Sequence, residues 1–318
     1  MTSVLSDQWV SRTTFAQDGA LMQPKLLPFT GMACNGVAEV DVQRLNQKFN
    51  KRMVLAYRFK SHAEQPHASV VGKLYRHSDG EQVYREMAAL WASGFTAMPA
   101  PLGYLPELNM VVQAAIPGQP LKMQLPEPDA PSCIRQFAQT LAAFHSSPHQ
   151  PRKHYDLQRH LLRCHPRHEV LMAQVPGTKT AINTFIRVAS QRMADPSIQQ
   201  TPIHADLHLK QAHASAQGCW LLDFDSLGWG DPAADLGNVL VFLKAKSRKV
   251  PQVDRLIETF LETYVQRMGA QILQRVPLYE ALTCLRSACK QYRLQPDGWQ
   301  PKVHHLLDQM IQHIHSLR

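Results

Sequence analysis

The chain has 318 residues, a formal net charge of +9, 44% hydrophobic residues and 19% charged residues. This is the composition of an ordinary globular protein, so a disordered or fibrous chain is excluded, and the length allows two domains with separate cores. No apolar run approaches the roughly 18 residues of a membrane span, and no basic flank precedes an apolar core at the N-terminus, so we expect a cytoplasmic protein.

The positive charge attracts anions in general. No zinc finger, helix-turn-helix pattern or strip of aromatic and basic residues accompanies it, so we expect neither a nucleic-acid nor a membrane partner. Six cysteines are scattered without a CxxC pair, which favours free and mostly buried thiols. Residues 160–168 collect His and Cys side chains, but no second ligand pair is evident, so a basic, solvated helix end explains them better than a zinc site.

The first part of the chain predicts a small sheet with one helix. Residues 1–35 have weak periodicity and indicate an N-terminal arm or a short capping element. Residues 80–94 carry apolar side chains at helical spacing, with Asp79 as a possible N-cap and Gly94 as a stop. The β-rich or alternating runs that predict strands are residues 38–45, 52–59, 69–76 and 109–115.

Beyond Gly118 the pattern becomes helical. The break at Pro117 and Gly118 predicts a boundary between an N-terminal lobe, residues 1–117, and a C-terminal lobe, residues 118–318. The expected fold class is α+β, with a small antiparallel sheet and one helix followed by a larger, mainly helical lobe. The expected helices of the second lobe are residues 132–146, 178–193, 254–271, 279–292 and 302–317.

The most informative polar groups lie in residues 201–240. Asp206 stands in a His-Ala-Asp triplet, Gln211 follows it, and Asp223 opens an Asp-Phe-Asp triplet that ends at Asp225. A kinase needs one carboxylate to orient an acceptor hydroxyl and oxygen ligands to hold magnesium against the nucleotide. A lone aspartate more often caps a turn, but this combination favours a catalytic base at Asp206 and metal ligands at Gln211 and Asp223, with Asp225 as a further candidate.

Other polar groups fit supporting roles. Lys73 interrupts an apolar strand, where it either faces solvent on an exposed sheet face or contacts nucleotide phosphates beside Glu86. His204 is expected to brace the loop through hydrogen bonds, and Asp235 is expected to tie the following helix to the same loop. The role of His208 stays open between a contact to substrate and simple exposure.

Taken together, these motifs resemble the aminoglycoside phosphotransferase and choline kinase-like family. The resemblance implies a bilobal protein-kinase-like fold in which a magnesium nucleotide, ATP or GTP, transfers a phosphoryl group to a small-molecule hydroxyl. It implies Lys73 on the phosphates with Glu86 as its partner, and a hinge strand at Gln113 and Ala115 against the nucleotide base. The matching pieces, in the order of the family and within residues 37–243, are VVGKLYR, REMAALWASGF, VVQAAIPGQPL, LAAFHSSP, HADLHLKQ, LLDFD and GDPAADLGN.

Three departures from the family pattern stand out. Ala205 replaces a usual glycine, and Gln211 replaces a usual asparagine, as in maltose-kinase-like members. The strand turn at residues 46–51 contains no glycine. A glycine-rich loop brings backbone amides close to phosphates, so here the side chains of Gln47, Lys48 or Asn50 would do part of that work.

The charge of the C-terminal helices bears on the acceptor. Residues 239–318 hold twelve Lys and Arg against six Asp and Glu, a net charge of +6. This argues against polycationic aminoglycosides and against choline, which aromatic side chains usually bind. We therefore expect a neutral or anionic metabolite such as a sugar.

Two alternatives remain beside the small-molecule kinase. The glycine-free turn favours a non-catalytic kinase-like protein that binds nucleotide or acts as a scaffold. A kinase acting on proteins is disfavoured, because no Ala-Pro-Glu segment follows Asp223.

Overall fold

The computed structural model describes residues 2–32, 37–48, 51–61, 68–77, 79–247 and 249–317. Residues 49–50 of the glycine-free turn, the side chain of Lys48, and Cys34 lie outside the described residues. The chain divides into two compact units, Met1–Pro117 and Gly118–Arg318. Among the described residues, no helix is both long and apolar enough to cross a membrane.

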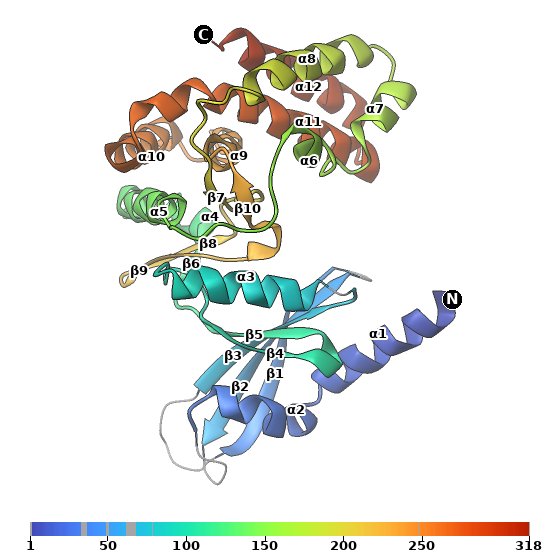
Figure 1. The fold of residues 1–318 in the computed structure, drawn as a ribbon, viewed down its shortest axis with the longest axis vertical. Helices are drawn as coiled ribbons and strands as arrows, with labels where there is room; N and C mark the ends of the chain where they lie inside the picture. The colour runs from blue at the N-terminus through green and yellow to red at the C-terminus, as the bar shows by residue number, and fades with distance from the viewer. Residues whose placement is uncertain are drawn as a thin grey trace. The chain divides into compact units, whose positions relative to one another are not determined.

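The first unit is built on an antiparallel sheet whose strands lie in the order β1-β2-β3-β5-β4 (Figure 1). This confirms the predicted sheet. The edge strand β4 was not predicted, because Pro99 and Pro101 read as breaks in the sequence; an edge strand tolerates a proline at its first residue. The strands are β1 Val37–Lys48, β2 Arg52–Ser61, β3 Ala68–Tyr75, β4 Pro101–Leu105 and β5 Met110–Ala114.

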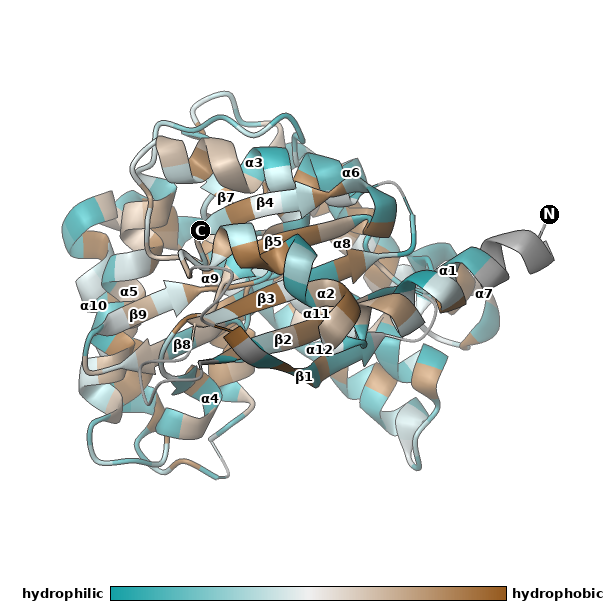
Figure 2. Cartoon of the chain, turned by 90° about the horizontal axis from the view of Figure 1, so that it is seen from below, coloured by the Kyte–Doolittle hydropathy of each residue, from teal (hydrophilic) through white to brown (hydrophobic). Residues whose placement is uncertain are grey.

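The core of this unit lies against the central strands, where Figure 2 shows the hydrophobic colour on β2, β3 and β5. Alternate residues of β2 are fully buried, namely Leu55, Tyr57 and Phe59, as the period of two of a strand requires. The hydroxyl of Tyr57 donates to the carbonyl of Ala16 at 2.7 Å, so this buried polar group is satisfied.

The described residues of this unit form three α-helices, not the single helix that the sequence predicts. Helix α3, Gly80–Ala92, is the expected one and contacts β4 and β5. The described part of the predicted N-terminal arm forms α1, Thr2–Ala16, and α2, Gly19–Leu26, followed by a 3₁₀ turn, Leu27–Phe29. The sequence does not reveal them because their apolar residues follow no clear helical period, and Pro24 lies inside α2. Their described core residues are Trp9, Ala16, Met22 and Leu26.

The second unit is mainly helical, and all five of its expected helices are confirmed within a few residues. Figure 1 shows α8, α11 and α12 side by side, in agreement with their contacts. The helices are α4 Leu121–Gln124, α5 Ala130–His145, α6 Leu157–Leu161, α7 His168–Gln174, α8 Lys179–Met193, α9 Ala233–Lys244, α10 Val253–Met268, α11 Val276–Leu294 and α12 Trp299–His315.

Short strands in the second unit hold the polar loops of residues 201–240. Strand β7, Thr201–Ile203, pairs with β10, Gly228–Gly230. Strand β8, Ala212–Ser215, lies between β6, Gln119–Pro120, and β9, Gly218–Leu221. The loop that contains Asp206 therefore begins at the end of one small sheet and ends at the start of another.

Candidate active site

The loop between β7 and β8 is held by a buried carboxylate. Asp235, on the first turn of α9, accepts hydrogen bonds from the backbone N–H of His204 at 2.6 Å and of Ala205 at 2.8 Å. Its Oδ2 also lies 3.1 Å from Nε2 of His145, whose Nδ1 is 2.6 Å from the hydroxyl of Tyr264. Burial raises the pKa of Asp235, but the hydrogen bonds and nearby imidazoles lower it by more, so the group stays ionised. Asp235 ties α9 to the loop, as expected.

His204 links this loop to the segment that carries Asp223. Its Nε2 lies 2.8 Å from the carbonyl oxygen of Leu222, so the expected bracing role is confirmed. Two residues beside these contacts have left-handed backbones: Ala205 with φ of 61° and Asp223 with φ of 69°. A non-glycine residue at positive φ is uncommon and marks a constrained position.

Gln211 and Asp223 lie together. The Gln211 side-chain amide donates to Oδ2 of Asp223 at 3.3 Å, and its Oε1 accepts from the backbone N–H of His208 at 3.2 Å. A carboxylate beside an amide is a set of hard oxygen donors that suits magnesium. Asp225 follows in a 3₁₀ turn, Phe224–Ser226. Among the described residues, no three His, Cys, Asp or Glu side chains form a group that could hold a metal.

His208 is neither exposed nor part of this pair. Its side chain is half-buried, and its ring lies 5.6 Å from that of Phe242 in an edge-to-face arrangement. Burial lowers the pKa of His208, against the opposing effect of Asp206.

Asp206 contacts two arginines that sequence reasoning missed. Its Oδ1 lies 2.8 Å from Nη2 of Arg163, which follows α6, and 3.0 Å from Nη2 of Arg286 on α11. Burial raises the pKa of Asp206, but these two guanidiniums lower it by more, so the pKa lies below its ordinary value. The signals in the sequence were the excess of basic residues in the C-terminal helices for Arg286 and the basic segment 160–168 for Arg163.

Residues 160–168 are only in part the solvated helix end that the sequence predicts, with Leu162, His165 and Arg167 exposed. His160, Cys164 and His168 are all buried. The ring of His160 lies 5.0 Å from that of Tyr155 and 5.7 Å from that of Tyr279, and these aromatic neighbours exclude water from it. The five cysteines that the structure describes are free and buried, as expected.

The remaining predicted residues belong to the first unit. Lys73 lies in β3 opposite Val54 and Val111 and is only 6% exposed, so the alternative of an exposed sheet face is wrong. Its Nζ is 5.4 Å from the centre of the Tyr75 ring. Glu86 lies on α3 and accepts a hydrogen bond from Gln82.

The predicted hinge residues lie at the end of β5. Gln113 pairs with Val71 of β3, and Ala115 follows the strand and is exposed. Their contact with a nucleotide base stays a prediction.

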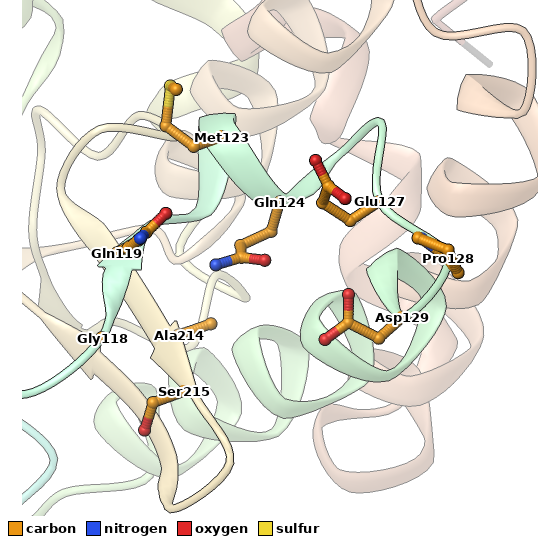
Figure 3. A pocket seen from close by; sticks show the side chains of 9 residues that line it. All are labelled: Gly118, Gln119, Met123, Gln124, Glu127, Pro128, Asp129, Ala214 and Ser215. Carbon is orange, nitrogen blue, oxygen red and sulfur yellow. The ribbon is translucent and has the colours of Figure 1, made fainter.

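A pocket of about 730 Å³ in the second unit contains none of the predicted residues. Figure 3 shows amide and carboxylate side chains around it, those of Gln119, Gln124, Glu127 and Asp129, while the side chain of Met123 points away. Ala214 and Ser215 of β8 close one side. Asp206, Arg163 and Arg286 are not among its lining residues.

Comparisons with known proteins give the family. A sequence model of the APH phosphotransferase enzyme family matches residues 56–276, more than half of the chain. No curated protein sequence matches the chain. A choline/ethanolamine kinase family protein from Mesorhizobium loti is similar in structure, with 17% identity, a TM-score of 0.65 and coverage of 99% of each chain.

Two further structures share the fold. The aminoglycoside phosphotransferase APH(4)-Ia has 15% identity and a TM-score of 0.58, covering 87% of this chain and 95% of its own. Amicoumacin kinase hAmiN, in a complex with AMP-PNP, Ca²⁺ and Ami, has 14% identity and a TM-score of 0.63, covering 85% of this chain and 88% of its own. These likenesses confirm the predicted kinase-like fold. The chain belongs to the APH phosphotransferase enzyme family, the family that its motifs resemble.

Proposed function

We propose that the protein is a small-molecule kinase that transfers the γ-phosphoryl group of ATP or GTP to an acceptor hydroxyl. Asp206 orients this hydroxyl and takes its proton, while Lys73, supported by Glu86, contacts the nucleotide phosphates. Gln113 and Ala115 contact the nucleotide base. The similarity to amicoumacin kinase, solved with AMP-PNP and Ca²⁺, supports a nucleotide and a divalent metal.

The observation that carries this proposal is the contact between Asp223, which follows β9, and Gln211, which lies on the same loop as Asp206. Gln211 and Asp223 would hold Mg²⁺, with Asp225 as a further ligand, and the metal would neutralise charge on the β- and γ-phosphates. Rotation of the Gln211 amide would turn its Oε1 toward Asp223. This Oε1 and a carboxylate oxygen of Asp223 could then bind the same cation. The hydrogen bonds from the backbone of His204 and Ala205 to Asp235 hold the loop next to Asp206 in place.

We further propose that the acceptor is a neutral or anionic metabolite such as a sugar. The net charge of +6 over residues 239–318 supports this, because a polycationic acceptor would be repelled. The loop glutamine at position 211, which the chain shares with maltose-kinase-like members, supports the same choice.

The test is a screen of metabolite hydroxyls with purified protein, Mg²⁺ and either ATP or GTP, read as phosphorylated product by mass shift, with Asp206→Asn as the blank. We expect product from at least one sugar-like acceptor and none with the blank. Nucleotide binding that does not depend on metal, with no turnover of any acceptor, would instead favour the non-catalytic scaffold.

A further inference from the structure

Arg163 and Arg286 place more positive charge beside Asp206 than this carboxylate can neutralise. Both form ion pairs with one oxygen, Oδ1, and their side chains are only 17% and 18% exposed, against 39% for Asp206. A guanidinium cannot lose its proton in a protein. The three groups together therefore carry a net charge of +1 in a partly desolvated setting.

Other carboxylates near the two arginines contact other groups. Asp235 accepts hydrogen bonds from the backbone of the loop. Glu169 contacts Arg167 at 3.4 Å, and Asp223 accepts from the amide of Gln211. None of these contacts brings a second carboxylate onto the two arginines.

The donors of the two guanidiniums are used unequally. Nη1 of Arg163 donates to the carbonyl of Ala205 at 2.6 Å and lies 3.3 Å from the hydroxyl of Tyr155. Within the described part of the chain, Arg286 makes its hydrogen bonds to protein through Nη2 alone. Because a guanidinium has five N–H donors in a planar fork, most of the Arg286 fork is available to a ligand.

This excess of partly buried positive charge lowers the stability of the fold unless a bound anion neutralises it. A charged group removed from water destabilises the fold unless it is paired and hydrogen-bonded. Guanidinium forks bind phosphate and carboxylate in a bidentate manner.

We propose that Arg163 and Arg286 bind an anionic group of the acceptor, a phosphate or a carboxylate, next to the hydroxyl that Asp206 orients. This inference rests on the proposed function and narrows the acceptor from neutral or anionic to anionic. The two arginines then determine specificity, because they repel a cationic acceptor and attract an anionic one.

Binding of small anions tests the site without knowledge of the acceptor. We would titrate the full chain with inorganic phosphate, and separately with acetate, by isothermal titration calorimetry. Arg163→Gln and Arg286→Gln should each weaken binding of the preferred anion at least about tenfold, because each removes a charge-assisted hydrogen bond. Asp206→Asn should tighten it about tenfold, because the carboxylate that competes for both guanidiniums loses its charge.

The control for overall charge is Arg187→Gln, which removes an exposed guanidinium from α8. Its anion affinity should equal that of the unmodified chain. An equal loss in Arg187→Gln and Arg286→Gln, or no gain in Asp206→Asn, would overturn the proposal. Tighter binding of phosphate indicates a phosphorylated acceptor, and tighter binding of acetate indicates a carboxylate-bearing one; both support the anion site.

Two further measurements keep the result interpretable. If Arg286→Gln does not fold, Arg286→Lys can replace it: lysine retains the charge without the planar fork and should still bind the anion more weakly. The measurement on Asp206→Asn does not depend on either Arg286 variant. When the protein is saturated with Mg²⁺ and AMP-PNP, it should still bind the anion. If the bound nucleotide abolishes anion binding, the arginines hold the phosphate that is transferred, and the proposal is overturned. If the anion binds as expected but nucleotide binding does not depend on metal, the result contradicts the kinase function and leaves the anion site supported.

Discussion

Ala205 has a left-handed backbone, with φ of 61°, while its N–H donates to Oδ1 of Asp235 at 2.8 Å. An L-residue with a Cβ in this conformation costs about 1–2 kcal/mol, so the buried carboxylate, not local preference, holds the backbone here. Because Asp206 is the next residue, this hydrogen bond determines where its carboxylate lies.

Replacing Ala205 with glycine should stabilise the protein. Glycine removes the cost of positive φ, although its greater freedom in the unfolded chain offsets part of the gain. We expect Ala205→Gly to raise the free energy of unfolding by about 0.5–1 kcal/mol, measured by urea denaturation. The same change in a helix, Ala181→Gly in α8, should instead lower it by about 1 kcal/mol. A loss of stability in Ala205→Gly would contradict this account.

Replacing Asp235 with asparagine should loosen the loop. Both oxygens of Asp235 accept hydrogen bonds, whereas an amide turns an NH₂ group toward one of the donors. We expect Asp235→Asn to lower the free energy of unfolding by about 3 kcal/mol. Displacement of Asp206 should also reduce turnover about 100-fold. The exposed Asp308 on α12 provides the control, since Asp308→Asn should leave stability and turnover unchanged.

The sequence predicted the parts of this site that are close in the chain. Gln211 and Asp223 are 12 residues apart, joined by a tight hairpin of β8 and β9, so the motif alone indicates their proximity. Arg286 lies 80 residues from Asp206. Periodicity shows that α11 has a buried face, but which residues that face brings to the loop depends on the packing of the whole unit.

The same reasoning explains why the sequence did not predict the burial of His160 and His168. Composition counts their charges and imidazoles but cannot show that Tyr155 and Tyr279 cover His160. Burial is a property of tertiary packing, and a short polar segment without periodicity carries no sign of it.

Replacing Asp223 with asparagine tests the proposed metal site. Asparagine tolerates the left-handed backbone of this position, so Asp223→Asn should fold as the unmodified chain does. We expect turnover to fall about 1,000-fold, because a metal ligand supplies several kcal/mol of charge stabilisation. The Mg²⁺-dependent part of the thermal shift with ATP should disappear, whereas it should persist in a variant of the exposed Asp297, Asp297→Asn. An unchanged Mg²⁺ response in Asp223→Asn would exclude Asp223 as a ligand.

His160 should make the protein sensitive to acid. Burial, reinforced by Arg286 and Arg163, lowers the pKa of His160 from 6.5 to about 3, and neither ring nitrogen has a hydrogen-bond partner among the described residues. Between these two pH values the unfolded chain binds a proton that the folded chain does not. The stabilisation is therefore complete above pH 6.5 and is lost as the pH falls toward 3, by at most roughly 5 kcal/mol.

Replacing His160 with phenylalanine should remove this contribution. An apolar ring between Tyr155 and Tyr279 does not titrate, so the unfolding free energy of His160→Phe should fall less steeply between pH 6.5 and 4. The slope with pH is the quantity to compare, because the larger ring also changes the packing at every pH. His305 on α12 is exposed, and His305→Phe should keep the original slope. If His160→Phe and His305→Phe lose stability equally as acid is added, the buried imidazole is not the group that responds to pH.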